Sequence, residues 1–100
     1  MKIFDQDTAK TLYKAILSLK TEDECRAFLE DVCTIKEVAD MSQRLEAAML
    51  LKEGYNYQQI GERLGISTAT ISRVSRCLNY GAGGYVTVLE RLESGDGADE

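Results

Sequence analysis

Residues 57–78 read YQQIGERLGISTATISRVSRCL, and this stretch decides the fold. Gly61 leaves room where two helices cross closely, and Gly65 suits a sharp turn with positive φ. Ser67 is a typical N-cap for a second helix. The apolar residues occupy the places that a helix-turn-helix keeps for its core: Ile60, Leu64, Ile66, Ile71 and Val74. The pattern predicts a bracing helix followed by a helix that enters the major groove of DNA.

The second helix of this pair carries most of the candidate DNA contacts. Such helices read base edges with their N-terminal turn, where threonine hydroxyls can hydrogen-bond and methyl groups can touch thymine. At the start of the bracing helix, free backbone N–H groups can meet phosphate. The alternative for the glutamines is helix capping and solvation, and for the arginines it is a solvated cation. For the residues at 68–70 the alternative is an ordinary exposed helix start. The predicted DNA-binding residues are Gln58, Gln59, Thr68, Ala69, Thr70, Ser72, Arg73 and Arg76.

Charge is distributed unevenly along the chain. The net charge of −5 is unfavourable for a protein that binds DNA. Residues 1–55 carry 8 basic and 11 acidic side chains, and residues 84–100 carry one basic and five acidic side chains. Residues 56–83 carry three arginines against one glutamate, a net charge of +2. The net-positive stretch is the one predicted to face DNA, and we expect modest, salt-dependent binding by two copies of the chain.

The composition disfavours several other classes of protein. Histidine is absent and Cys25, Cys33 and Cys77 form no C-x-x-C pair, so the usual zinc ligands are missing and the thiols should be reduced. No nucleophile motif or phosphate-binding glycine loop indicates an enzyme. The first seven residues lack the apolar core of a signal peptide, and the longest apolar run, Ala47–Leu51, is too short to span a bilayer. We expect a cytoplasmic protein without a metal, a cofactor or a membrane partner.

Capping signals predict the remaining helices of an all-α fold. A first helix is expected over about residues 7–19, and a capping box at residues 21–24 starts a second. A capping box of Thr34 with Glu37 starts a third, which should reach Glu53 before a glycine. The apolar face of this third helix is broader than one layer can cover, which favours a dimer.

The C-terminal end is expected to be looser. A hinge with three glycines over residues 79–84 precedes a last helix at about residues 85–93. Residues 94–100 are small and acidic and are expected to be disordered. Residues 1–93 should then form a single helical domain.

The sequence resembles the Trp repressor family, and within it the small bacterial proteins of the YerC/YecD type. The resemblance rests on the ATISR segment at residues 69–73, on Gly54 before the bracing helix and on the layout of six helices. It covers roughly residues 10–93. It implies an intertwined homodimer whose two recognition helices lie about one DNA turn apart. It also implies repression at a palindromic operator, switched by a small corepressor.

The same resemblance implies an effector pocket. Thr34, Arg44 and Arg73 fall on positions that hold tryptophan in the family. Val74 stands where the family has a glycine that admits the indole ring, and Cys77 stands where a serine faces the amino group. Because a valine side chain would fill the space of the ring, we expect an effector other than tryptophan, or none.

The departures from the family leave two hypotheses open. The positions that contact DNA in the family correspond to the DNA-binding residues predicted above, except Arg76. They also include Glu62, which replaces a lysine of the family. Asn79 replaces another lysine, so two phosphate contacts are lost. The first hypothesis is a dimeric, sequence-specific transcriptional regulator that binds double-stranded DNA. The alternative is an adaptor that uses the helix-turn-helix surface to bind a partner protein, with its acidic ends repelling nucleic acid.

Overall fold

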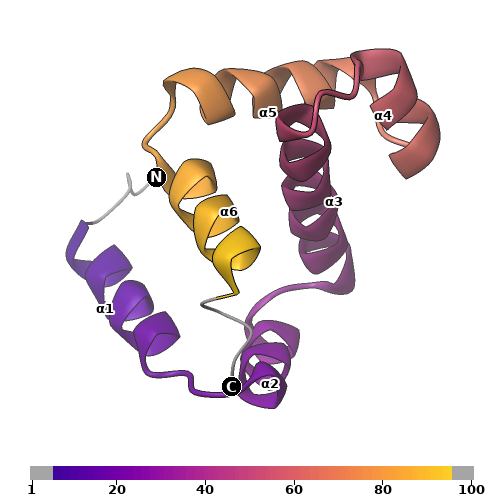
Figure 1. Ribbon diagram of the computed structural model, residues 1–100. Helices are drawn as coiled ribbons and strands as arrows, with labels where there is room; N and C mark the ends of the chain where they lie inside the picture. The colour runs from indigo at the N-terminus through magenta and orange to yellow at the C-terminus, as the bar shows by residue number, and fades with distance from the viewer. Residues whose placement is uncertain (1–5, 96–100) are drawn as a thin grey trace. The chain divides into compact units, whose positions relative to one another are not determined.

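The computed structural model describes residues 6–95, and this range consists of helices joined by short connections (Figure 1). No strand occurs in it, so the predicted all-α class and six-helix layout are confirmed. The contacts group the chain into two compact units, residues 1–38 and 39–100, within the stretch expected to form one domain. The helices are α1 (Gln6–Leu17), α2 (Glu22–Val32), α3 (Ile35–Lys52), α4 (Tyr57–Leu64), α5 (Thr68–Tyr80) and α6 (Gly84–Ser94).

Side-chain caps start α2 and α3. The Thr21 hydroxyl accepts a hydrogen bond from the Glu24 N–H at 3.1 Å, while the Glu24 carboxylate accepts one from the Lys20 N–H at 2.8 Å. At the start of α3 the box is reciprocal: the Glu37 N–H donates to the Thr34 hydroxyl at 3.0 Å, and the Thr34 N–H donates to the Glu37 carboxylate at 2.8 Å. Each bond satisfies a donor that the first helical turn would otherwise leave unpaired, so the predicted helix starts hold.

The helix α1 ends at Leu17, two residues before the predicted end. The Ser18 hydroxyl donates to the Ala15 carbonyl at 2.6 Å, and the Leu19 N–H donates to the Ile16 carbonyl at 3.1 Å. These bonds span three residues, so they tighten the last turn and end the regular helix.

Apolar side chains remain exposed in the N-terminal unit. Within α1 only Ala9 is buried, and α2 has no buried residue. The large apolar side chains left exposed in the described part of this unit are Leu12, Tyr13, Ile16, Leu17, Val32 and Ile35. These helices thus owe their form mainly to capping and local hydrogen bonds.

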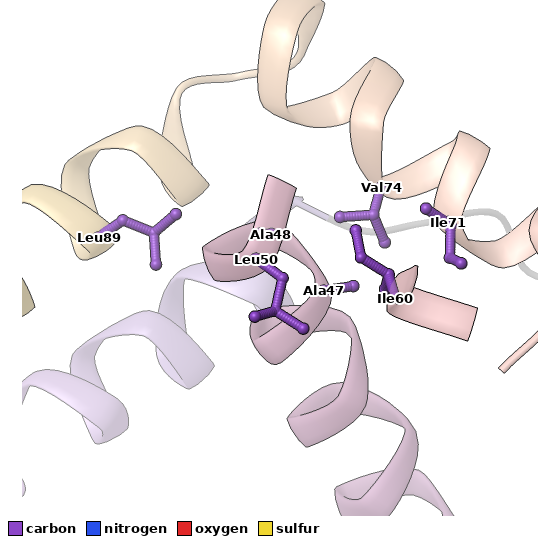
Figure 2. Close-up of a cluster of buried hydrophobic side chains, with 7 residues drawn as sticks. All are labelled: Ala47, Ala48, Leu50, Ile60, Ile71, Val74 and Leu89. Carbon is purple, nitrogen blue, oxygen red and sulfur yellow. The ribbon is translucent and has the colours of Figure 1, made fainter. Parts of the chain in front are cut away.

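The C-terminal unit, by contrast, has a continuous core (Figure 2). Ile60 of α4 and Ile71 of α5 are completely buried, and the close-up shows the Ile60 side chain beside Val74. Burial of each such side chain contributes roughly 1.5–3 kcal/mol. The cluster consists of Ala47, Ala48 and Leu50 from α3, with Ile60, Ile71, Val74 and Leu89 from the three following helices.

Two glycines set the geometry of the turn between α4 and α5. Gly65 lies in the left-handed region with φ of 69°, and its N–H donates to the Gly61 carbonyl at 2.8 Å. A Cβ on Gly61 would lie 3.3 Å from the Ile66 carbonyl oxygen and 3.8 Å from Ile71 Cδ1. The predicted roles of these glycines, a sharp turn and a close helix crossing, are therefore confirmed.

Three predicted boundaries at the C-terminal end are wrong by a few residues. The helix α5 continues to Tyr80, because the Gly81 N–H still donates to the Cys77 carbonyl at 2.9 Å, and the hinge shortens accordingly. The helix α6 begins at Gly84 and includes Ser94, where the tail was expected to start. Gly95, with φ of 82°, caps it. The remainder of the predicted tail, residues 96–100, lies outside the described range.

Candidate nucleic-acid interface

A capped and exposed N-terminal turn begins α5. The Ser67 hydroxyl accepts a hydrogen bond from the Thr70 N–H at 3.1 Å and donates to the Thr70 hydroxyl oxygen, also at 3.1 Å. Thr68 and Ala69 are exposed beside this cap, while Thr70 is half-buried. One face of the first turn is thus fixed by the cap, and small side chains with hydroxyl and methyl groups remain open to a ligand.

Ile71 and Val74 determine which face of α5 packs against the core. They lie three residues apart, so they share one face of the helix, and both are buried. The residues between and beyond them, Arg73 and Arg76, are exposed, and Ser72 is half-buried. The amphipathic pattern therefore turns both arginines away from the core, on the helix that also carries Thr68 and Ala69.

The arginines of the net-positive stretch are in different states. The Arg63 guanidinium lies over the Tyr55 ring, 5.0 Å from its centroid, and a hydrogen bond to Tyr55 raises the pKa of Arg63. Arg73 and Arg76 are in no ion pair within the part of the chain that the structure describes. All three arginines are exposed, so each keeps its charge available to a polyanion, and two of the three lie on α5.

The two predicted glutamines of α4 have local partners. Gln59 forms a capping box with Asn56: each side chain accepts from the other residue's backbone N–H, at 2.9 Å and 2.8 Å. The Gln58 amide donates to the Glu62 carboxylate at 3.4 Å. Capping, the alternative considered for these residues, is what Gln59 does in this structure. Both side chains are exposed, so both remain near any ligand that meets the start of α4.

The candidate effector residues lie at the start of α3, within α3 and on α5, and they differ in exposure. Thr34 caps α3 in the N-terminal unit, and Arg44 is half-buried on the same helix in the C-terminal unit. Arg73 and Cys77 are exposed on α5, whereas Val74 between them is 1% exposed. The Val74 side chain therefore occupies the core between helices.

Two cavities of the C-terminal unit lie elsewhere. One of about 190 Å³ is lined by α3 and α6, with Met49 and Leu92 among its residues. The other, of about 340 Å³, lies among α3, α5 and α6 and includes Ser75 and Asn79. None of the candidate effector residues lines either one.

One contact at the turn had no signal in the sequence. The Gln43 side-chain amide of α3 donates to the Leu64 carbonyl at the end of α4, at 3.1 Å. Twenty-one residues separate the two, and a lone glutamine on a helix looks like any solvated polar residue. The contact is therefore visible only once the helices are packed.

Metal sites, membrane spans and disulfides each have requirements with which residues 6–95 can be compared. Over residues 6–95 there is no group of three or more Cys, Asp or Glu placed to hold a metal ion. No helix in that range has the length and apolar character needed to cross a bilayer. The three cysteines are free thiols, with Cys25 and Cys77 exposed and Cys33 half-buried.

The fold and the exposed α5 turn match known proteins along most of the chain. The family model for the Trp repressor protein matches residues 7–93. The chain belongs to the Trp repressor family. This confirms the resemblance first noted from the ATISR segment, and the family is one of regulators rather than enzymes.

Individual members of the Trp repressor family agree with this assignment. The uncharacterized protein YerC of Bacillus subtilis is 51% identical over 82 residues, which cover 82% of this chain and 79% of that protein. The crystal structure of a TrpR-like protein from Eubacterium eligens has 54% identity and a TM-score of 0.84, covering 87% of this chain and 90% of the other. A Staphylococcus aureus protein of solved structure has 42% identity and a TM-score of 0.83, covering 87% of each chain.

Proposed function

We propose that this protein is a sequence-specific DNA-binding transcriptional regulator that represses a palindromic operator as a homodimer. The observation that carries the proposal is the start of α5, where Thr68 and Ala69 lie exposed beside the Ser67 cap. Arg73 and Arg76 extend from the same helix and lack an ion-pair partner within residues 6–95. A base-reading turn backed by free cations suits the major groove, and family membership supports the same use.

The homodimer is supported by the apolar side chains that the chain leaves uncovered. Leu12, Ile16 and Leu17 on α1 are 43%, 47% and 83% exposed. A second copy could cover this surface and would supply the second recognition helix that a palindrome requires. Two copies also compensate for the small positive charge of residues 56–83 in each chain, because they double the number of phosphate contacts.

We propose further that any effector differs from tryptophan. Val74 carries a side chain at the position where the family admits an indole ring, and it is buried against Ile60 and Ile71. An exposed thiol, Cys77, replaces a hydroxyl at the position facing the ligand's amino group. A flat amino acid would therefore find neither the space nor the same hydrogen-bond partner.

Selection of bound duplexes from a random pool at low salt tests the DNA-binding proposal. We expect the wild type to enrich one palindromic sequence, and Thr70→Glu to enrich none. Glutamate three residues after the Ser67 cap completes a capping box, so the helix should form normally while the new charge repels phosphate. If the wild type enriches nothing while a pull-down returns one stoichiometric protein bound at residues 57–78, the adaptor function replaces this proposal.

The salt dependence of binding tests the role assigned to Arg76. Arg76→Ala should weaken binding to the selected duplex and to unrelated duplexes alike, and it should reduce the slope of log Kobs against log salt by about 2, because the proposed dimer carries two copies of Arg76. Arg26→Ala is the matched control, because Arg26 already pairs with Glu30 at 3.3 Å on the exposed surface of α2. An unchanged slope in Arg76→Ala would remove this residue from the interface.

A further inference from the structure

Gln43 connects α3 to the turn between the two helices of the DNA-binding motif. Its Nε2 atom donates to the Leu64 carbonyl oxygen at 3.1 Å, and the bond is partly buried. Leu64 is the last residue of α4, and α5 begins four residues later at Thr68. The bond therefore reaches the connection that determines where α5 starts.

The Leu64 carbonyl needs a partner from outside its own helix. The last carbonyls of an α-helix have no intrahelical donor, and α4 is only eight residues long. The Gly65 N–H is used by the Gly61 carbonyl at 2.8 Å. Gly65 then turns the chain into the left-handed region, so the backbone does not continue past Leu64 as a helix. Gln43 supplies the donor that the turn lacks.

The hydrogen bond between Gln43 and Leu64 constrains the orientation of the turn, which the apolar core contacts alone do not. The core contacts of Ile60, Ile71 and Val74 hold α4 and α5 against α3, but apolar burial depends on area and tolerates small rotations. A hydrogen bond weakens steeply when its angle is lost. We propose that Gln43 is a positioning residue, which orients the α4–α5 turn so that Thr68 and Ala69 meet the bases in register. This proposal rests on the DNA-binding function proposed above.

The test replaces the donor with a side chain of similar length and no charge. Gln43→Met should keep the helix content, since both residues are good helix formers. Loss of one neutral hydrogen bond should raise the Kd for the selected duplex about tenfold. Amide exchange at Gly65, whose N–H donates to the Gly61 carbonyl, should quicken by a similar factor, and the carbonyl carbon resonance of Leu64 should shift.

Two further variants control for the substitution itself. Gln43→Lys keeps a terminal donor at similar reach, so the slow exchange at Gly65 should be restored. Exchange is the measurement for this variant because the added charge would itself alter DNA affinity. Thr87→Met places the same methionine at an exposed position of α6 and should leave both exchange and DNA affinity unchanged.

Each outcome of these measurements either supports or contradicts the positioning role of Gln43. Unchanged exchange and carbonyl shift in Gln43→Met would show that the bond does not hold the turn. Faster exchange with unchanged DNA affinity would show that the bond is merely structural. If the wild type binds no duplex, the proposed function fails and the DNA role of Gln43 fails with it, while the exchange data still show whether Gln43 holds the turn. Faster exchange together with weaker binding, restored exchange in Gln43→Lys and an unaffected Thr87→Met would support the proposal.

Discussion

The N-terminal and C-terminal units use similar sequence signals with different results. Both contain capped amphipathic helices, yet the C-terminal unit buries Ile60 and Ile71 completely, whereas α1 buries only Ala9 and α2 buries nothing. The connections differ as well. Every positive-φ residue within 6–95 is a glycine of the C-terminal unit, whereas α2 ends at Cys33 in extended backbone.

An amphipathic pattern alone therefore does not predict which element covers the apolar face of a helix. In the C-terminal unit the turn at Gly65 brings α4 and α5 together, so each helix covers the other's face. In the N-terminal unit the local hydrogen bonds are equally well formed, but the stripe on α1 stays exposed. The C-terminal unit thus covers the apolar faces of α4 and α5, whereas the N-terminal unit has an apolar face that remains available to a partner.

The largest expected effect tests whether the C-terminal unit is the more strongly packed of the two. Ile71→Ala removes a fully buried side chain, so the free energy of unfolding should fall by about 2–5 kcal/mol in urea. Lys10→Ala on the exposed surface of α1 is the control and should change it by no more than about 0.5 kcal/mol. Equal losses from the two substitutions would contradict the contrast between the units.

A second substitution tests whether the exposed stripe of α1 is an interface. Ile16→Glu places a charge on this stripe, so the proposed dimer should dissociate at micromolar concentration. Loss of two-site binding should then weaken affinity for a palindromic duplex by about 100-fold or more. Light scattering after size-exclusion chromatography and duplex titration provide the measurements.

The control for that experiment is Lys14→Glu, which adds negative charge to the same helix at a residue outside the stripe. It should leave the molecular mass in solution unchanged. A dimer that persists in Ile16→Glu would mean that another surface joins the two copies, and the apolar stripe of α1 would need a different explanation.

The smallest expected effect concerns the turn that makes the units differ. Gly65→Ala forces a Cβ into a backbone with φ of 69°, which should lower the free energy of unfolding by about 1 kcal/mol. Nothing lies within 4 Å of the added Cβ, so backbone conformation, rather than a clash, is the cause. Thermal and urea unfolding of the variant measure this, and an unchanged midpoint would show that the turn tolerates the substitution.

Much of this arrangement was readable from local sequence. Thr21, Thr34 and Ser67 each cap the helix that their spacing predicted, because capping involves residues only three apart. The boundaries around α6 were less predictable. Consecutive glycines give no periodic signal, and whether Gly81 continues or ends a helix depends on one backbone hydrogen bond to Cys77.

The candidate interface divides in the same way. The exposure of Thr68, Ala69, Arg73 and Arg76 follows from helical periodicity once Ile71 and Val74 are assigned to the core. The contacts that the polar residues make with one another do not follow from this periodicity. That the Arg63 guanidinium lies over the Tyr55 ring depends on how the turn before α4 folds back.

Local sequence is enough to predict the helices, the sharp turn at Gly65 and the helix-turn-helix at residues 57–78, because caps, glycine conformations and apolar spacing act within a few residues along the chain. The tertiary structure is needed to place the Gln43 amide at the Leu64 carbonyl, 21 residues away, and to bring Leu89 of α6 into one core with Ile60 and Val74. Such contacts depend on distances between helices, and a pattern along one chain does not contain those distances until the core has packed.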